Sequence, residues 1–255
     1  MNAHHQYDCI VLGAGAAGLM CAITAARRGR SVLVLEKSNK PGKKILMSGG
    51  GRCNFTNLHC EPENFLSENP YFCISALSQY TQWDFIQWVE SHDIAYHEKK
   101  LGQLFCDGSS KDILGGLLND LAITGTPIHC DEPAQQIDRR PSGGFDVQTS
   151  VANYRCESLV VATGGLSIPT LGGSGFGFDL AESLGLPLIP RRAGLVPFVF
   201  TDSQRALCQR LAGLSVDVVA QADDGVFAEA MLFTHRGLSG PACCLLYTSP
   251  SPRDS

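Results

Sequence analysis

The sequence predicts an α/β fold in which a parallel strand–helix–strand unit comes first, a β-meander follows, and a second, mainly β region comes last. Three observations predict it. A glycine-rich turn joins an apolar strand to a helix near the N-terminus. Three short strand segments with turns between them precede residue 165, and from about Arg191 the sequence pattern changes to that of strands alternating with loops. The chain has 255 residues, 44% apolar and only 18% charged, which indicates a folded core of one large domain or two smaller ones.

The first unit lies within the first forty residues. Residues 8–12 form a short apolar run typical of a buried strand, and GAGAAG follows directly. The next residues predict a helix that ends at Gly29, and residues 31–36 predict a second buried strand with Glu36 at its end. A strand, a glycine turn, a helix and a strand in this order predict a Rossmann-like, dinucleotide-binding domain.

Each part of this fingerprint has a physical task. Gly13 permits the tight turn, Gly15 lets the backbone approach a pyrophosphate, and Gly18 lets the helix pack closely on the strand. The helix N-terminus offers free N–H groups to phosphates. Glu36 can accept hydrogen bonds from ribose hydroxyls and would repel a 2′-phosphate, which disfavours NADP at this site. The alternative is a purely structural glycine turn.

The segment after Glu36 separates FAD from NAD. Residues 37–57 form a long, basic, glycine-rich loop where a simple NAD domain would usually begin another helix. Three consecutive glycines, Gly49–Gly51, let backbone N–H groups face a ligand closely. The loop favours FAD over a simple NAD-dependent dehydrogenase. Its basic residues either face an anion or are a solvated surface: Lys37, Lys40, Lys43, Lys44 and Arg52.

Several motifs carry a family resemblance. SGGGRCNFTN follows the GAGAAG fingerprint, and LVVATGGLSIPTLGGSGFGFDLAESLG, LVPF and FTHRGLSGPA come later, in an order that covers about residues 7–242. In this respect the chain resembles the YhiN/HI0933-like (BaiN-like) family of flavoproteins. The resemblance implies a Rossmann-like FAD-binding domain of the two-dinucleotide-binding-domain type, with a β-meander and an inserted, mainly β substrate domain.

The resemblance also implies an activity. Family members are expected to be FAD-dependent oxidoreductases that use hydride from NAD(P)H to reduce a carbon–carbon double bond. The first candidate substrate is a uridine of large-subunit ribosomal RNA, which would give dihydrouridine. A steroid-like or amine small molecule is an alternative, and a non-catalytic nucleotide-binding fragment is another.

The candidate site residues come from the fingerprint, the basic loop and the later ATGG turn. Arg52 and Cys53 are catalytic candidates because they lie in the best-matched loop, although a buried structural thiol is the favoured alternative for Cys53. His235 is a third, because histidine suits proton transfer near neutral pH, while residues 234–240 can also form only a turn and a helix start. The expected cofactor contacts are Gly13, Gly15, Ala16, Ala17, Gly18, Glu36, Lys37, Lys44, Ser48, Gly49, Gly50, Gly51, Arg52, Cys53, Asn54, Thr163, Gly164 and Gly165.

The middle of the chain supplies helices and the meander. Residues 81–94 and 111–125 predict helices, and both tryptophans are expected in the core rather than on a base-stacking surface. Residues 134–140, 144–150 and 152–163 predict three strands of a meander, with PSGG as the first turn. The last strand is expected to return to the nucleotide-binding sheet.

The domain organisation is expected to be an FAD-binding domain at 1–190, the beginning of the substrate domain at 191–244, and an artefactual or disordered tail at 245–255. The tail changes abruptly to serine, proline and charge, and the resemblance stops near Ala242. The sequence therefore suggests a C-terminal truncation.

Composition excludes several classes of protein. The net charge of −5 gives no global basic field for nucleic acid. Eleven cysteines without a CxxC pair argue against a metal site or disulfide reductase chemistry and fit a reducing cytosol. The chain shows neither a signal peptide nor an 18-residue apolar run, so a cytoplasmic protein without a membrane span is expected. The sequence does not indicate an oligomeric state.

Overall fold

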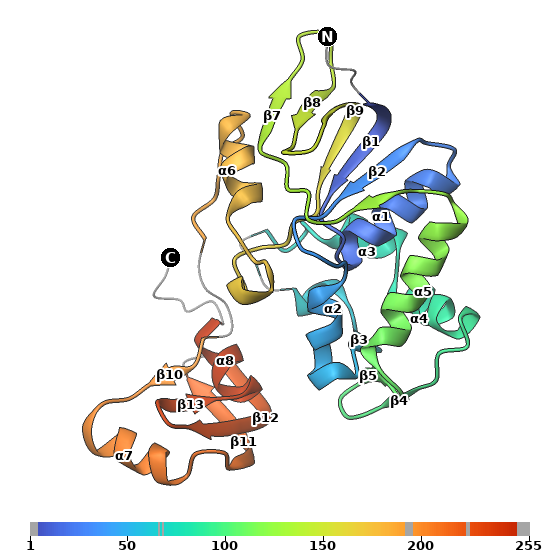
Figure 1. Ribbon diagram of the computed structural model, residues 1–255. Helices are drawn as coiled ribbons and strands as arrows, with labels where there is room; N and C mark the ends of the chain where they lie inside the picture. The colour runs from blue at the N-terminus through green and yellow to red at the C-terminus, as the bar shows by residue number, and fades with distance from the viewer. Residues whose placement is uncertain (1–4, 66, 68, 192–195, 223–224, 249–255) are drawn as a thin grey trace. The chain divides into compact units, whose positions relative to one another are not determined.

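The computed structural model (Figure 1) describes residues 5–65, 67, 69–191, 196–222 and 225–248. The chain divides into two compact units, each described here by itself. The first unit is Met1–Cys60 with Ser78–Leu188, and the second is Glu61–Leu77 with Ile189–Ser255. The grouping of Glu61–Leu77 with the second unit is not indicated by the sequence, which assigned those residues to the first domain.

A six-stranded sheet forms the centre of the first unit, in the order β6-β2-β1-β9-β8-β7. The N-terminal strand β1 (His5–Leu12) pairs in parallel with β2 (Val32–Leu35) on one side and with β9 (Asn153–Val161) on the other. The short β6 (Ile128–His129) extends the parallel part beside β2. The predicted Rossmann-like arrangement is confirmed, including the return of the last meander strand to the side of β1.

The meander is confirmed as well. β7 (Gln136–Arg139), β8 (Phe145–Gln148) and β9 run antiparallel, with Ile137 opposite Val147 and Val147 opposite Tyr154. Side chains alternate across the sheet. One face of β1 and β2 packs against the helices, and the other face packs with β8 and β9 around Val147 and Tyr154.

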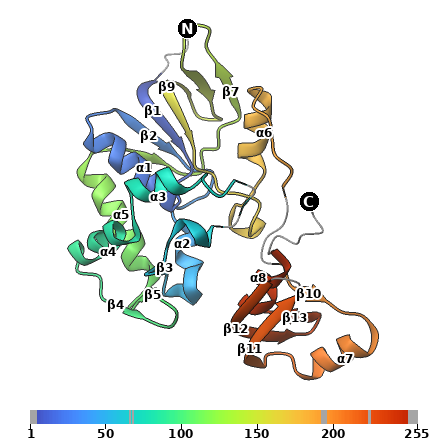
Figure 2. The same ribbon diagram turned by 180° about the vertical axis from the view of Figure 1, so that it is seen from behind.

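Helices α1 (Ala16–Arg27) and α5 (Ser110–Ile123) pack beside each other on one face of this sheet, as both views show (Figures 1 and 2). α4 (Gln82–Ser91) lies next to them. Thr81 begins α4 and Ser109 begins α5, each in a capping box with the acidic residue three positions later. The predicted helices at 81–94 and 111–125 are confirmed.

The expectation for one tryptophan is wrong. Trp88 packs against the core, but the side chain of Trp83 is 57% exposed. The buried stripe of α4 is formed by Ile86 and Val89, and Trp83 lies beside this stripe rather than on it. The sequence pattern placed Trp83 near the apolar face without resolving that difference.

The described residues also form several shorter elements. A three-stranded sheet of β3 (Asn54–Asn57), β5 (Gln103–Cys106) and β4 (Tyr96–Glu98) was not predicted. The basic loop contains α2 (Lys43–Met47) and a 3₁₀ turn, η1 (Ser48–Gly51). The remaining short elements are η2 (Pro62–Asn64), α3 (Ile74–Gln79), η3 (Pro169–Leu171) and α6 (Phe176–Ser183).

The second unit contains a four-stranded antiparallel sheet in the order β10-β13-β12-β11 (Figure 2). β10 (Phe198–Val199), β11 (Ser215–Ala222) and β12 (Gly225–Thr234) lie in the region where the sequence predicts alternating strands, from about Arg191. The sequence did not predict β13 (Gly237–Ser239) or α7 (Asp202–Arg210). α8 (Pro241–Thr248) contains the first four residues of the predicted tail, and residues 249–255 lie outside the described residues. Within the described part of the chain, no helix is long and apolar enough to cross a bilayer.

Candidate dinucleotide-binding site

A cavity of about 690 Å³ lies in the first unit, where β1, β2 and β9 end. Leu12 and Leu35 end the first two strands, and Ala162 and Thr163 directly follow the third. Ligands of open α/β sheets bind at such carboxyl edges, and cofactor sites typically measure about 300–1,000 Å³. The predicted residues that line the cavity are Gly13, Gly15, Ala16, Ala17, Glu36, Lys37, Lys44, Ser48, Cys53, Asn54, Thr163 and Gly164.

The three fingerprint glycines have distinct surroundings. Gly13 has φ +104°, and an added Cβ there would lie 2.6 Å from the carbonyl oxygen of Ala162. An added Cβ at Gly18 would overlap the carbonyl oxygen of Gly13, so Gly18 serves the packing of α1 and does not line the cavity. At Gly15 an added Cβ would meet nothing within 4 Å, and Gly15 lines the cavity. The open side of the turn is therefore where a ligand can approach the backbone.

Glu36 fixes the shape of this turn. Its carboxylate accepts hydrogen bonds from the backbone N–H groups of Ala14, at 2.8 Å, and Ser38, at 2.7 Å. These bonds join the glycine turn to the beginning of the basic loop. A carboxylate oxygen has more than one acceptor position, so Glu36 can also accept from a ribose hydroxyl in the cavity.

The cavity is rich in positive charge. Lys37, Lys40, Lys43 and Lys44 all line it, and none of the ion pairs formed by the described residues includes any of them. Lys37 donates to Ser174 and Lys44 to Ser167, each at 3.3 Å. Cations without a carboxylate partner around a helix N-terminus favour an anionic ligand.

The three consecutive glycines, which the sequence predicts to face a ligand, form a turn beside the cavity wall. Gly49, Gly50 and Gly51 have φ values of +57°, +66° and +90° and form the tight turn η1 without lining the cavity. An added Cβ at Gly49 would lie 2.6 Å from the backbone nitrogen of Asn54. The glycines let the chain turn sharply, and the turn brings Ser48, Cys53 and Asn54 to the cavity wall. Gly165 also lies outside the lining.

Cys53 and Arg52 differ in their surroundings. Cys53 lines the cavity but is only 5% exposed, and burial raises the pKa of its thiol against the opposing effect of a hydrogen bond with Ser48. The thiol is therefore protonated at neutral pH and is not a reactive thiolate. Arg52 is exposed and does not line the cavity.

His235 belongs to the second unit. It is exposed and lies in the turn between β12 and β13, where Thr234 donates through its hydroxyl to the carbonyl of Gly237. α8 begins four residues after Gly237. The turn that the sequence offered as the alternative for this segment is present, but the strand β13 follows it and the helix begins just after the segment, at Pro241.

The hydroxyl group of Thr163 bears on whether the cavity fits a dinucleotide. Its hydroxyl oxygen is buried and has no hydrogen-bond partner within the described structure, although Thr163 lines the cavity. A buried polar atom without a partner is costly unless a ligand or water satisfies it. With the open side of Gly15 and the uncompensated lysines, this hydroxyl fits a phosphate-bearing, hydroxyl-rich ligand.

An apolar wall completes the cavity, and the sequence did not identify it. Met20 comes from α1, Phe55 from β3, Phe85 from α4, and Ile113 and Leu117 from α5. Their spacing within each helix predicted only a core face, because no local pattern indicates which part of such a face borders a cavity. In the described residues, no group of three or more His, Cys, Asp or Glu side chains could hold a metal ion.

The fold and the cavity define a Rossmann-type dinucleotide-binding protein. Within that class, the model of the HI0933-like protein Rossmann domain matches residues 7–218, and that of the HI0933-like protein barrel and H2TH domain matches residues 192–246. The chain belongs to the HI0933-like family, as the sequence resemblance indicated.

Two relatives share much of the sequence. The chain is 50% identical over 238 residues to the ribosomal RNA dihydrouridine synthase of Escherichia coli K12, covering 93% of this chain and 59% of that protein. It is 45% identical over 255 residues to the ribosomal RNA dihydrouridine synthase of Haemophilus influenzae, covering 98% of this chain and 63% of that protein. The chain thus spans about 60% of the length of these relatives.

A more distant relative is the 3-dehydro-bile acid delta(4,6)-reductase of Clostridium scindens, at 28% identity over 90% of this chain and 57% of that protein. Among solved structures, the open conformation of a flavocytochrome c3 fumarate reductase matches with a TM-score of 0.51 and 16% identity, over 84% of this chain and 47% of that chain. This similarity supports the fold.

Proposed function

We propose that this chain carries the FAD-binding part of an oxidoreductase that uses NAD(P)H to reduce a carbon–carbon double bond, with a uridine of ribosomal RNA as substrate. The observation that carries the proposal is the lysine-rich cavity at the ends of β1, β2 and β9, in a chain 50% identical to a ribosomal RNA dihydrouridine synthase. The long basic loop that forms one wall of the cavity supports FAD, rather than NAD, as the ligand bound there.

The residues of the chain have separate tasks in this proposal. The backbone at Gly15–Ala17 and the N-terminus of α1 would receive the pyrophosphate, and the lysines would balance its charge. Glu36 holds the glycine turn in shape, and the hydroxyl of Thr163 would donate to the cofactor. Bound FAD would supply the hydride transfer itself.

Reduction of the double bond adds a hydride to one carbon and a proton to the other. The proton needs an acid from the protein or solvent. Cys53 is the candidate acid on the cavity wall, because its thiol stays protonated at neutral pH. The exposed Arg52 and His235 are candidates for contacts with substrate or solvent.

A small apolar substrate is a second candidate. The apolar wall of the cavity and the similarity to a bile acid reductase favour it. A cytoplasmic location is also part of the proposal, since eleven cysteines scattered without a CxxC pair suit a reducing compartment.

The test begins with the visible absorbance spectrum of the purified chain after gel filtration. Flavin bands that remain with the protein are expected, and a folded but colourless chain would contradict the FAD assignment. The holoprotein is then mixed anaerobically with NADPH or NADH and an unmodified ribosomal RNA fragment. Mass spectrometry of the digested RNA should show a uridine that has gained two hydrogen atoms. Turnover of a steroid enone with unchanged RNA would support the second candidate, and no turnover of either would indicate a non-catalytic binding fragment.

A further inference from the structure

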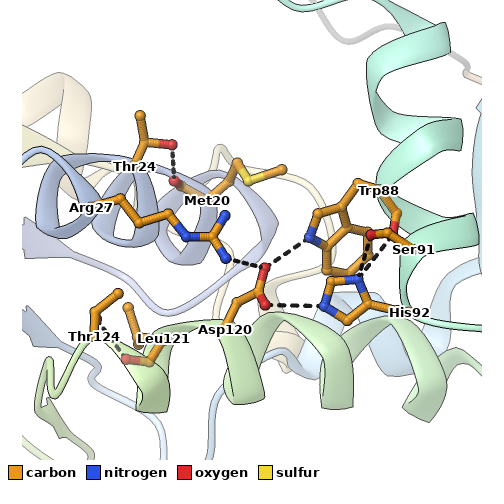
Figure 3. Close-up of polar contacts among 9 residues, drawn as sticks. All are labelled: Met20, Thr24, Arg27, Trp88, Ser91, His92, Asp120, Leu121 and Thr124. Carbon is orange, nitrogen blue, oxygen red and sulfur yellow. Dashed lines mark hydrogen bonds and ion pairs between the residues drawn. The ribbon is translucent and has the colours of Figure 1, made fainter.

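A buried carboxylate joins three helices close to the cavity. The side chain of Asp120, on α5, is only 6% exposed, and three donors point at it (Figure 3). Trp88 Nε1 lies 2.9 Å away and His92 Nε2 3.0 Å away, from α4 and the residue that ends it. The guanidinium of Arg27, the last residue of α1, lies at 3.0 Å. One side chain thus connects α5 to both other helices.

The carboxylate of Asp120 is kept in its charged form. Burial by itself would raise its pKa, but the hydrogen bonds from Trp88 and His92 and the charge of Arg27 lower the pKa below its ordinary value. The neighbourhood is shaped for this contact. An added Cβ at Gly116 would lie 2.9 Å from the indole of Trp88, so only glycine lets the ring approach α5 this closely.

The same three helices form most of the apolar wall of the cavity, to which β3 adds Phe55. On each helix, a residue that lines the cavity and a residue of the Asp120 cluster are three or seven residues apart, which places both on one helical face. The pairs, with the cavity residue first, are Met20 and Arg27 on α1, Phe85 and Trp88 on α4, and Leu117 and Asp120 on α5.

The connection between wall and cluster is direct on α4. The rings of Phe85 and Trp88 are stacked, with centroids 5.3 Å apart and an interplanar angle of 4°. A change in the hydrogen bond from Trp88 to Asp120 would therefore displace an aromatic side chain that borders the cavity. Helices transmit such a displacement because they are rigid over one or two turns.

We infer that Asp120 is a positioning residue for the cofactor site, and that it holds α1, α4 and α5 so that the apolar wall is formed before the cofactor binds. The inference rests on the proposed FAD site. Asp120 does not line the cavity, so it acts through the wall residues and not by contact with the ligand.

The test is FAD affinity, measured by titrating the apoprotein of the full chain and following the quenching of flavin fluorescence. Asp120→Asn is expected to weaken FAD binding by about three- to thirtyfold. The matched control is Val147→Ala, since Val147 is buried in the other core cluster and does not line the cavity. At a similar loss in unfolding temperature, V147A should leave the affinity within about twofold of wild type. If D120N does not fold, Trp88→Phe removes one donor while keeping aromatic packing, and it should weaken binding in the same direction.

A double-mutant cycle with Phe85→Leu separates positioning from general destabilisation. If Asp120 acts through the wall, D120N should weaken binding much less in the F85L background than in wild type. Independent, additive effects of D120N and F85L would overturn the inference, as would equal losses of affinity in D120N and V147A. A wild-type chain that binds no FAD would instead overturn the proposed function, and the inference with it.

Discussion

Alanine substitutions at Gly15 and Gly18 of the glycine-rich fingerprint should act differently, one on ligand affinity and the other on stability. Gly15 has φ −86° and ψ −172°, which alanine adopts without strain, and an added Cβ would meet nothing within 4 Å. Its Cβ would project into the cavity, where a ligand is expected. At Gly18 an added Cβ would overlap the carbonyl oxygen of Gly13 inside the protein. Gly15→Ala therefore tests whether a ligand binds against this turn, and Gly18→Ala tests whether α1 must pack closely against Gly13.

The magnitudes follow from these surroundings. Gly15→Ala should leave the free energy of unfolding unchanged or raise it by about 0.4–1 kcal/mol, because alanine restricts the unfolded chain. A methyl group forced between a backbone and its ligand costs about 1–3 kcal/mol, so FAD affinity should fall by about 5- to 150-fold. Gly18→Ala should instead lower the free energy of unfolding by about 1–3 kcal/mol, since α1 must move away from the carbonyl of Gly13.

Two assays on the same preparations decide the matter. Denaturant unfolding of the apoprotein gives stability, and titration with FAD gives affinity. The reasoning predicts a stable G15A that binds FAD poorly. A G15A chain that binds FAD as tightly as wild type would refute the placement of the ligand against this turn. A G15A chain that is strongly destabilised would refute the claim that the space beside Gly15 is open.

Three further predictions concern single side chains. Glu132→Gln should lower the free energy of unfolding at pH 7 by about 1–3 kcal/mol, because the buried carboxylate accepts from Thr149 and Tyr154 at 2.7 Å each. Burial alone would raise the pKa of Glu132, but these bonds and a neighbouring histidine lower the pKa below its ordinary value. The stabilisation by this carboxylate should therefore be complete above about pH 5 and fall on acidification. Urea unfolding at several pH values measures it, and equal stability of E132Q and wild type at neutral pH would contradict the prediction. Thr163→Val should weaken FAD binding by about two- to tenfold with little loss of stability, since the hydroxyl has no partner within the described structure; unchanged affinity in the titration would remove this residue from the site. The thiol of Cys53 should react with iodoacetamide more slowly than a solvent-exposed cysteine at pH 7.5, and rapid labelling by peptide mass spectrometry would count against its burial and raised pKa.

The parts of the site that the sequence predicted are those that local chemistry determines. The turn at Gly13 needs a positive φ, and Glu36 stands at the end of the next strand, so both can be identified from spacing alone. The meander before Thr163 was equally clear from its turn signals. Each of these features depends on residues close together in the chain.

The apolar wall and the Asp120 cluster depend on residues far apart in the chain. Phe85 and Leu117 each fit an ordinary core face, and only tertiary packing places them at one cavity. Asp120 also has no sequence signal, because an acidic residue in a helix is usually solvated. Gly49 is a third case: the sequence predicts a cofactor contact, and the structure places it in a tight turn that does not line the cavity.

The polar and apolar sides of the cavity therefore depend on residues at different separations in the sequence. Its polar side comes mainly from a continuous segment near the N-terminus, in which the turn, the helix start and the lysines are fixed by local geometry, and Thr163 adds a hydroxyl after β9. Its apolar side is assembled mainly from three helices that one buried carboxylate connects. Phosphate recognition should then tolerate substitutions in α4 and α5, whereas the shape available to a ring system should not. The affinities of D120N for ADP and for FAD measure this difference. We expect D120N to lose affinity for FAD and to retain its affinity for ADP. Equal losses for both ligands would show that the two sides of the cavity do not form independently.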